Sequence, residues 1–177
     1  MQAVIKMEID LIKIREIAKD KEDENWEFRT FLKSHDMPLE QMDSMVHRLY
    51  ERVSSEIDCT ACGNCCREIS PSLNQKDIER LSRGLAIHPD QFINQFLVED
   101  KENFSDGFLF NKRPCPFLSG NICAYYDLRP ESCASYPHLH KEDFVFRLIG
   151  VIENYEICPI VFNVFELLKA KLWGRGA

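Results

Sequence analysis

The eight cysteines are the residues of this chain whose type and spacing most directly indicate chemistry, and they fall into two groups of four. The first group is nearly contiguous, in the run CTACGNCC, and consists of Cys59, Cys62, Cys65 and Cys66. The second group is spread along the chain and consists of Cys115, Cys123, Cys133 and Cys158. A two-residue spacer lets a tight turn aim both sulfurs at one inorganic centre. The spacing therefore predicts that all eight cysteines are metal ligands.

The first three cysteines have the spacing with which bacterial ferredoxins present three thiolates to a 4Fe–4S cluster. In those proteins the fourth thiolate comes from a remote cysteine followed by proline, and here both Cys115 and Cys158 precede proline. One or two 4Fe–4S clusters are therefore expected. Zinc is the alternative, because the segment from Cys59 to Gly63 also has the form of a zinc knuckle and zinc binds four thiolates tetrahedrally. Spacing alone does not separate the two.

The vicinal pair Cys65-Cys66 indicates more than one site. Adjacent side chains in an extended segment point to opposite sides, so these two cysteines are not expected to share one small ion. Eight thiolates divide evenly into two four-ligand centres, and one centre beside a nearby thiol is the other interpretation. Cys158 stands where a helix N-cap is expected, and the partial positive charge there favours a thiolate.

Charged residues near the cysteines are candidates for a supporting role. Arg67 follows the first run directly and Arg129 lies four residues before Cys133. A guanidinium beside a four-thiolate centre offsets its negative charge and donates hydrogen bonds to sulfur; ordinary surface arginines are the alternative. His138 and His140 could ligate or gate a site, although surface or hydrogen-bonding imidazoles are the more common case. No catalytic residue is assigned.

Composition excludes several classes of protein. The formal charge of −7 disfavours nucleic acid and anionic membranes as partners, since phosphate binding requires clustered Lys and Arg. No segment approaches the ~20 apolar residues of a membrane span, and the first ten residues carry charges where a signal peptide is apolar. A cytoplasmic location is expected, where reduced thiols favour metal binding over disulfides. The partner is expected to be an unidentified protein or small molecule.

Apolar periodicity and capping residues predict a mostly α fold with a small β hairpin or strand element, in a single metal-organised domain. A helix over 38–57 is the strongest prediction, with apolar residues at spacings of three and four. Further helices are expected after Asn74, with Asp77 as its capping partner, after His88 and from Pro159, with a short helical turn after Pro130. Residues 107–126 are expected to form a small hairpin with Ser119-Gly120-Asn121 as its turn. Residues 144–152 are expected to form a buried strand. Residues 1–54 are expected to be a helical extension packed on a cysteine-cluster domain of residues 55–177.

Taken together, these residues resemble the YkgJ-like CxxCxxCC cysteine-cluster family, a zinc- or iron-chelating domain shared with flagellin lysine-N-methylases. The resemblance rests on the run from Cys59 to Cys66, the Cys-Pro-Phe-Leu segment at Cys115, the segment from Tyr126 to Cys133, and the Cys158-Pro159 pair. It covers roughly residues 55–170. It implies metal chelation, and in the longer methylases a cluster is thought to take part in methyl transfer.

Three functions follow as hypotheses. The first is an iron–sulfur protein with a redox or group-transfer role. The second is a structural zinc-binding module for protein interaction, without catalysis. The third is a transferase related to the methylases, although the chain has no G-x-G-x-x-G nucleotide loop. Whether the protein is an enzyme stays open.

Overall fold

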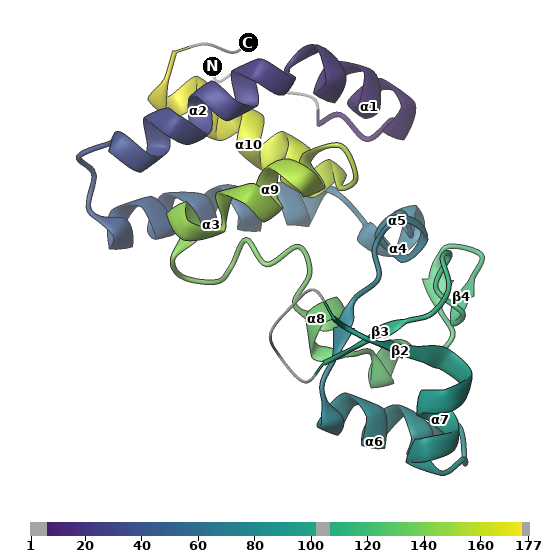
Figure 1. Cartoon of the computed structure of the whole chain (residues 1–177). Coiled ribbons are helices and arrows are strands. Elements are labelled where there is room, and N and C mark those ends of the chain that lie inside the picture. Colours follow the sequence, from purple (N-terminus) through teal and green to yellow (C-terminus); the bar gives the residue numbers. More distant parts are fainter. Residues whose placement is uncertain (1–6, 102–106, 175–177) are drawn as a thin grey trace. The chain divides into compact units, whose positions relative to one another are not determined.

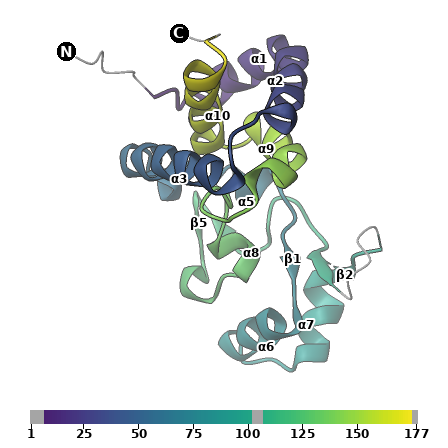
Figure 2. The same cartoon turned by 90° about the vertical axis from the view of Figure 1, so that its left-hand side faces the viewer.

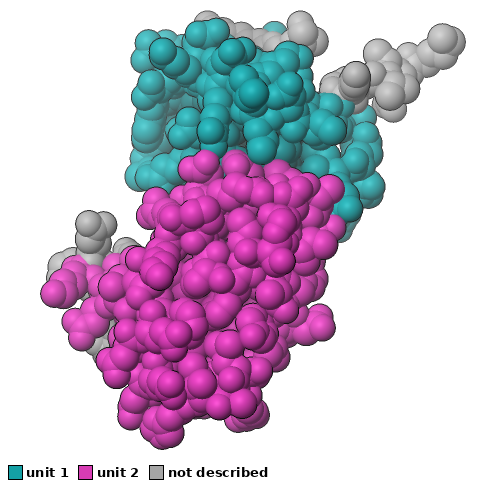
Figure 3. All heavy atoms as spheres, turned by 90° about the vertical axis from the view of Figure 1, so that its right-hand side faces the viewer, with its two compact units in different colours: residues 1–58, 137–177 teal, residues 59–136 magenta. Residues whose placement is uncertain are grey.

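A computed structural model describes residues 7–101 and 107–174. The fold is mostly α-helical with small antiparallel strands, as predicted. Contacts divide the chain into two compact units, coloured separately in Figure 3. Unit 1 contains residues 1–58 and 137–177, and unit 2 contains residues 59–136. The sequence indicated one domain with an N-terminal extension; in the structure, the C-terminal segment groups with the N-terminal helices. The predicted division at residue 54 stays a prediction.

Unit 1 consists of helices. Its elements are α1 (Leu11–Asp20), α2 (Glu22–Ser34), α3 (Leu39–Glu56), the 3-10 helix η2 (Phe144–Arg147), α9 (Leu148–Tyr155) and α10 (Pro159–Leu172). The predicted helix over 38–57 is confirmed as α3. Its buried residues include Met42, Val46, Leu49 and Val53, which lie on one face because a helix turns once every 3.6 residues.

The core of unit 1 forms where α10 packs against α3, as both views of the ribbon show (Figures 1 and 2). α10 is buried over most of its length, so its apolar surface needs partners on several sides. α2 supplies Phe28, whose ring lies 5.2 Å from that of Phe165 and 5.3 Å from that of Trp173. Burying such large rings is the main favourable term in packing these helices together.

The prediction of a buried strand over residues 144–152 is wrong, because this segment forms η2 and the start of α9. Phe144, Leu148 and Val151 are buried at helical spacing, while Phe146 and Ile149 are 69% and 50% exposed. A short apolar run does not distinguish a strand from a helix. The decisive contact is remote, since the carboxylate of buried Asp43 on α3 accepts hydrogen bonds from the backbone N–H groups of Asp143 (2.8 Å) and Phe144 (2.9 Å).

Unit 2 combines short helices with two small sheets. Its helices are α4 (Cys59–Cys62), α5 (Cys65–Glu68), α6 (Gln75–Gly84), α7 (Pro89–Phe96), the 3-10 helix η1 (Tyr126–Leu128) and α8 (Glu131–Ala134). Strands β1 (Ser72–Leu73), β3 (Phe108–Phe110) and β2 (Leu97–Glu99) pair antiparallel in that order. The hairpin of β4 (Leu118–Ser119) and β5 (Ile122–Cys123) forms the second sheet.

The capping signals of unit 2 are confirmed. Asn74 and Asp77 form a reciprocal capping box at the start of α6, which satisfies N–H groups that a helix leaves without intrahelical partners. His88 caps α7, and Pro89 occupies its first turn. The predicted hairpin turn is also present, with Gly120 at φ +63°. A small apolar core lies beneath these elements and includes Leu73, Ile78, Leu81, Phe92, Leu97, Phe110 and Phe117.

Across the two described stretches of the chain, every helix is too short or too polar to cross a membrane.

Candidate metal centre

The first cysteine run folds as two helical turns, α4 and α5, separated by Gly63 and Asn64. It was expected to be an extended loop with Cys65 and Cys66 on opposite sides. That premise is wrong, because both residues lie in α5, where successive side chains are turned by only about 100°. Their side chains are joined by a hydrogen bond. The vicinal pair therefore gives no reason to place its two thiols at separate sites.

The turn of the β4–β5 hairpin packs against the first cysteine run. Gly63 adopts φ +60°, and a β-carbon there would lie 2.6 Å from the carbonyl oxygen of Asn121. The Asn121 side chain donates to the carbonyl oxygen of Ala61 at 2.7 Å. Arg67 completes the contact by donating to the carbonyl oxygens of Cys62 (3.0 Å) and Gly120 (2.9 Å). These bonds bring the first cysteine run next to the hairpin that carries Cys123.

Cys115 is attached to the first run by the backbone itself. Its N–H donates to the carbonyl oxygen of Cys66 at 2.8 Å, and its own carbonyl oxygen accepts from Leu118 N–H at 3.0 Å. Leu118 pairs with Cys123 across the hairpin. Three cysteines from separate segments are thus connected through main-chain hydrogen bonds, whose geometry does not depend on side-chain rotamers.

Cys133 is placed by α8, which is fixed to α6 and β1. The buried carboxylate of Asp77 accepts from the N–H of Glu131 at 3.0 Å, in addition to its capping bond to the N–H of Asn74 at 3.2 Å. Arg80 pairs with the same carboxylate at 2.5 Å and donates to the carbonyl oxygen of Arg129 at 2.7 Å. On the other side, the Ser132 hydroxyl donates to the carbonyl oxygen of Ser72 at 2.7 Å.

Negative charge on Cys66 raises the pKa of three thiols from these segments: Cys115, Cys123 and Cys133. Burial, together with negative charge on Cys66 and Cys123, raises the pKa of Cys115 to about 11. Burial also raises the pKa of Cys123, with Cys66 contributing. Burial raises the pKa of Cys133 to about 12, and the other three thiols act in the same direction. Like charges affect each other in this way only at short range.

Cys66 is the exception within this group. A hydrogen bond from Cys65 lowers the pKa of Cys66 to about 7 and outweighs burial, and the positive charges of Arg67 and Arg129 act in the same direction. A thiol with this pKa is substantially ionised at neutral pH. Cys66 is thus the thiol most ready to act as a thiolate ligand, and its three neighbours would have to lose their protons when a metal binds.

Arg67 and Arg129 both lower the pKa of Cys66 through their positive charge, but they make different contacts. Arg129 stacks its guanidinium 3.4 Å from the centre of the Tyr126 ring and donates to the Tyr126 carbonyl oxygen at 2.8 Å. Its charge favours ionisation of Cys66 and Cys123. Arg67 was expected to donate hydrogen bonds to sulfur; in the structure it donates to carbonyl oxygens and to the Asn121 side chain. These hydrogen bonds join the cysteine run to the hairpin turn, and the charge of Arg67 also lowers the pKa of Cys66.

The donor set suits zinc or an iron–sulfur cluster, since thiolate sulfur is a preferred ligand of both. Among the described residues, no group of three or more His, Cys, Asp or Glu side chains is close enough to hold a metal ion as the side chains stand. Side chains on the fixed backbone frame would have to turn toward a common point to complete a site.

The remaining predicted ligands have different surroundings. Cys59 is exposed, and Cys62 is partly buried. Cys158 belongs to unit 1, where it is buried and occupies the N-cap position of α10 as expected. Ligation by each of the eight cysteines stays a prediction.

His138 and His140 also belong to unit 1. His138 has a left-handed backbone (φ +63°), and its carbonyl oxygen accepts from Arg147 at 2.8 Å. Burial lowers the pKa of His138 to about 4, with the charges of Lys141, His140 and Arg147 adding to the effect. Its imidazole is therefore neutral at physiological pH, and its predicted role in gating or ligation remains open.

The long-range positioning contacts of Gly63, Asp77, Arg80 and Asn121 carried no signal in the sequence. The Asn74–Asp77 pair indicated a helix cap, but the same carboxylate also holds α8, more than fifty residues later. Nothing local marks such a contact. The sequence indicated a zinc-knuckle form that includes Gly63 and a hairpin turn at residues 119–121, and only the tertiary structure shows that Gly63 contacts this turn.

Comparison with known proteins supports the interpretation of the cysteines. A family model described as "CxxCxxCC: Putative zinc- or iron-chelating domain" matches residues 58–149, just over half of the chain. The matched segment contains seven of the eight cysteines, and Cys158 lies beyond its end. No curated protein and no solved structure matches the chain at a significant level. The protein therefore belongs to the CxxCxxCC family of zinc- or iron-chelating domains.

Proposed function

We propose that Cys66, Cys115, Cys123 and Cys133 form one four-thiolate centre, and that this centre holds a 4Fe–4S cluster with a redox or group-transfer role. The observation that supports the proposal is the hydrogen bonding that links these segments, from Cys115 N–H to the Cys66 carbonyl oxygen and through the pairing of Leu118 with Cys123, and charge on Cys66 raises the pKa of the other three thiols.

The surroundings of the four thiols suit a charged soft centre. Four thiolates leave a net negative charge that a low-dielectric site must offset. Arg129 is held in place by Tyr126 and acts on Cys66 and Cys123. When bound, a cluster of this kind exchanges electrons at a potential set by hydrogen bonds to sulfur and by burial. The residues of the chain would hold the centre, balance its charge and limit the access of water.

Structural zinc is the second candidate. The observation that favours it is the construction of unit 2, whose strands are only two or three residues long and whose cysteine-bearing helical turns are only four residues long. Elements this short are weak on their own, and a closed four-thiolate zinc site contributes directly to folding. In that case the protein would serve as a binding module without chemistry of its own.

Elemental analysis of protein purified without oxygen distinguishes a 4Fe–4S cluster from structural zinc. The proposal expects iron and acid-labile sulfide in equal amounts, near four of each per chain for one cluster, with broad visible absorption that bleaches on reduction. Zinc near one per chain without sulfide supports the second candidate and rejects the first. Full-length protein that binds neither metal, after reconstitution with iron, sulfide or zinc, would reject both.

Cysteine variants test which thiols form the centre. Serine at Cys115, Cys123 or Cys133 is expected to reduce the bound metal sharply, because serine is a poor ligand for soft metals. Cys59→Ser is the matched variant outside the proposed set, and it is expected to retain the metal. Retention of full metal content by the Cys115, Cys123 and Cys133 variants, each confirmed as folded by circular dichroism, would contradict the assignment.

A further inference from the structure

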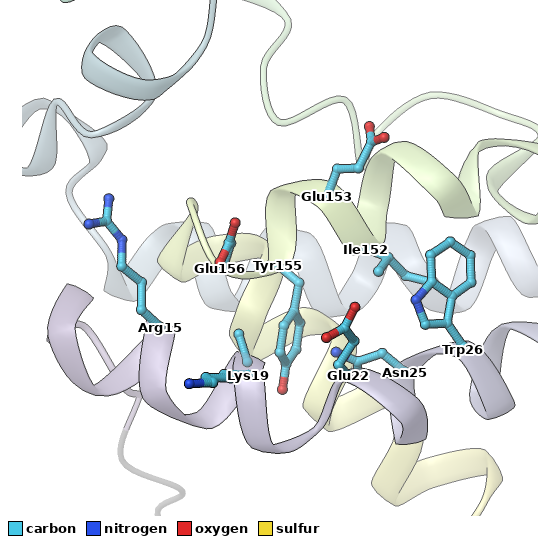
Figure 4. Close-up of a pocket in the computed structure, with 10 residues that line it drawn as sticks. Arg15, Lys19, Glu22, Asn25, Trp26, Ile152, Glu153, Tyr155 and Glu156 are labelled. Carbon is cyan, nitrogen blue, oxygen red and sulfur yellow. The ribbon is translucent and has the colours of Figure 1, made fainter.

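One side of α9 is apolar and exposed, although the helix packs into the core of unit 1 with its other side. Its buried residues are Leu148, Val151 and Tyr155. Phe146 of η2 and Ile149 lie on the opposite side at about 100° per residue, and they are 69% and 50% exposed. Figure 4 shows Tyr155 pointing from α9 toward α1 and α2, while Glu153 projects from the other side of the helix. A helix that is apolar all round is usually buried all round, so the exposed side is typical of a surface that another molecule covers.

Gly150 lies in the middle of this exposed side. In the described parts of the chain, a β-carbon on Gly150 would meet no heavy atom within 4 Å, so internal packing does not require glycine there. Glycine weakens a helix interior, but it lets another backbone approach closely. The distance between two packed helices depends on the side chains where they cross. The surface formed by Phe146, Ile149, Gly150 and Glu153, here called the α9 face, is therefore suited to a second helix that crosses at Gly150.

The charges on the two sides of Gly150 are opposite in sign. Arg147 lies three residues before it and Glu153 three residues after it. The guanidinium of Arg147 donates to backbone carbonyl oxygens. The charges of Asp43 and Asp143 favour its ionisation, but burial outweighs them and lowers the pKa of Arg147. A further carboxylate beside Arg147 would therefore be favourable.

A second copy of the chain supplies such a carboxylate. When two α9 helices cross antiparallel at Gly150, residues equally far from the crossing on opposite sides face each other, so Arg147 of each copy faces Glu153 of the other. The same crossing brings the apolar residues of both copies together. We propose that the protein forms a two-fold symmetric dimer through the α9 face. A two-fold interface must be self-complementary, and a face that carries both signs of charge fits a second copy better than a strongly basic or strongly acidic partner.

The dimer is expected to be weak. The α9 face is small compared with a permanent interface, and the exposed side chains of Glu142 and Glu156 flank it at its two ends, where like charges limit the affinity. Sedimentation velocity of the full-length protein at a series of concentrations measures the association. The wild type is expected to dimerise with a dissociation constant on the order of 10–100 µM. The measurement is independent of the metal centre, because the α9 face belongs to unit 1.

Ile149→Glu tests whether association uses the α9 face. It places a charge within the proposed apolar contact and is expected to weaken dimerisation roughly tenfold or more. Val98→Glu is the matched control, because Val98 is an apolar residue of unit 2 with a similar exposure of 49%, and it is expected to leave dimerisation unchanged. A wild type that stays monomeric up to about 0.5 mM overturns the proposal. A dimer that the two variants affect alike also overturns it.

Gly150→Gln separates association from folding. Glutamine favours a helix more than glycine does, and open space surrounds this position in the described structure. The variant is therefore expected to unfold at a higher denaturant concentration than the wild type, when both are measured well below the dissociation constant. Its side chain would stand between the crossing helices and is expected to weaken dimerisation roughly tenfold. A Gly150→Gln protein that dimerises as tightly as the wild type would show that the helices do not cross at Gly150.

Discussion

Gly63 lies so close to Asn121 that a β-carbon on Gly63 would stand 2.6 Å from the Asn121 carbonyl oxygen and 2.9 Å from its α-carbon. The neighbouring atoms belong to the backbone, so they cannot move aside as the end of a side chain could. Gly63 also has φ +60°, a conformation that is costly for residues with a β-carbon. The first cysteine run can therefore approach the β4–β5 turn this closely only because residue 63 has no β-carbon.

Replacing Gly63 with alanine should therefore displace the cysteine run from the hairpin. The backbone strain costs about 1–2 kcal/mol, and the steric clash adds to it. Gly120→Ala is a matched control, because Gly120 has φ +63° with open space around its α-carbon. We expect Gly63→Ala to lower both metal content and the free energy of unfolding well beyond Gly120→Ala. Equal losses in denaturant unfolding would show that the close approach is unimportant.

Arg67 should be more sensitive to replacement by lysine than a neighbouring arginine with a single contact. Its guanidinium joins Cys62, Gly120 and Asn121, and a lysine ammonium cannot reproduce that planar fork. Arg67→Lys is expected to lower the free energy of unfolding by about 1–2 kcal/mol and to weaken metal retention against a chelator. Arg113→Lys, which affects a bond to Ser70, should have little effect. Similar chelator resistance in the two variants would contradict the positioning role.

Asp77→Asn should loosen the attachment of α8, and with it Cys133. The buried carboxylate accepts from Asn74 N–H, Glu131 N–H and Arg80, and an amide cannot accept from all three donors. We expect a loss of about 2–4 kcal/mol in the free energy of unfolding, measured by denaturant titration. Asp90→Asn, at an 81% exposed side chain in the first turn of α7, should change it by less than about 1 kcal/mol.

Glu166 should make unit 1 less stable in acid. Burial opposes its ionisation, but hydrogen bonds from Lys169, Lys21 and Tyr155 outweigh burial and lower the pKa of Glu166 below its ordinary 4.5. The stabilisation is therefore fully present above pH 4.5 and is lost as the pH falls through the folded-state pKa.

Glu166→Gln should be less stable than the wild type at neutral pH, partly because Lys169 is fully buried beside it at 2.8 Å. The stability difference should shrink as the pH falls below about 4.5. Chemical denaturation at a series of pH values checks this, with Glu40→Gln on an exposed helix end as the control. A difference that is constant with pH would contradict the assignment of the ion pairs.

His138 should titrate far below an ordinary histidine. Burial lowers the pKa of His138 from 6.5 to about 4, so the unfolded chain binds this proton more readily. The contribution of neutral His138 to the free energy of unfolding is fully present above pH 6.5 and should decline as the pH falls toward about 4. Titration of the imidazole resonances by NMR measures the value directly. His138→Asn keeps a residue that tolerates the left-handed backbone and should remove that part of the pH dependence; a midpoint near 6.5 would contradict the burial of the ring.

Local patterns explain why many elements could be predicted from the sequence. The capping box at Asn74, the helix start at His88 and the hairpin turn at Gly120 all depend on hydrogen bonds or backbone angles within a few residues. The segment after Asp143 shows the limit. Its apolar run is compatible with a strand or a helix, and Asp43, a hundred residues earlier, supplies the hydrogen bonds that start a helical segment.

The sequence by itself determined the chemistry available to this protein, because the number and type of soft ligands and their local spacing are written in the order of residues. The tertiary structure decided how the cysteine-bearing segments are held, since main-chain and buried side-chain hydrogen bonds join them to distant parts of the chain. It also decided which residues of the apolar run after Asp143 stay exposed. Residue types set what a site can bind, and long-range packing sets where the residues meet.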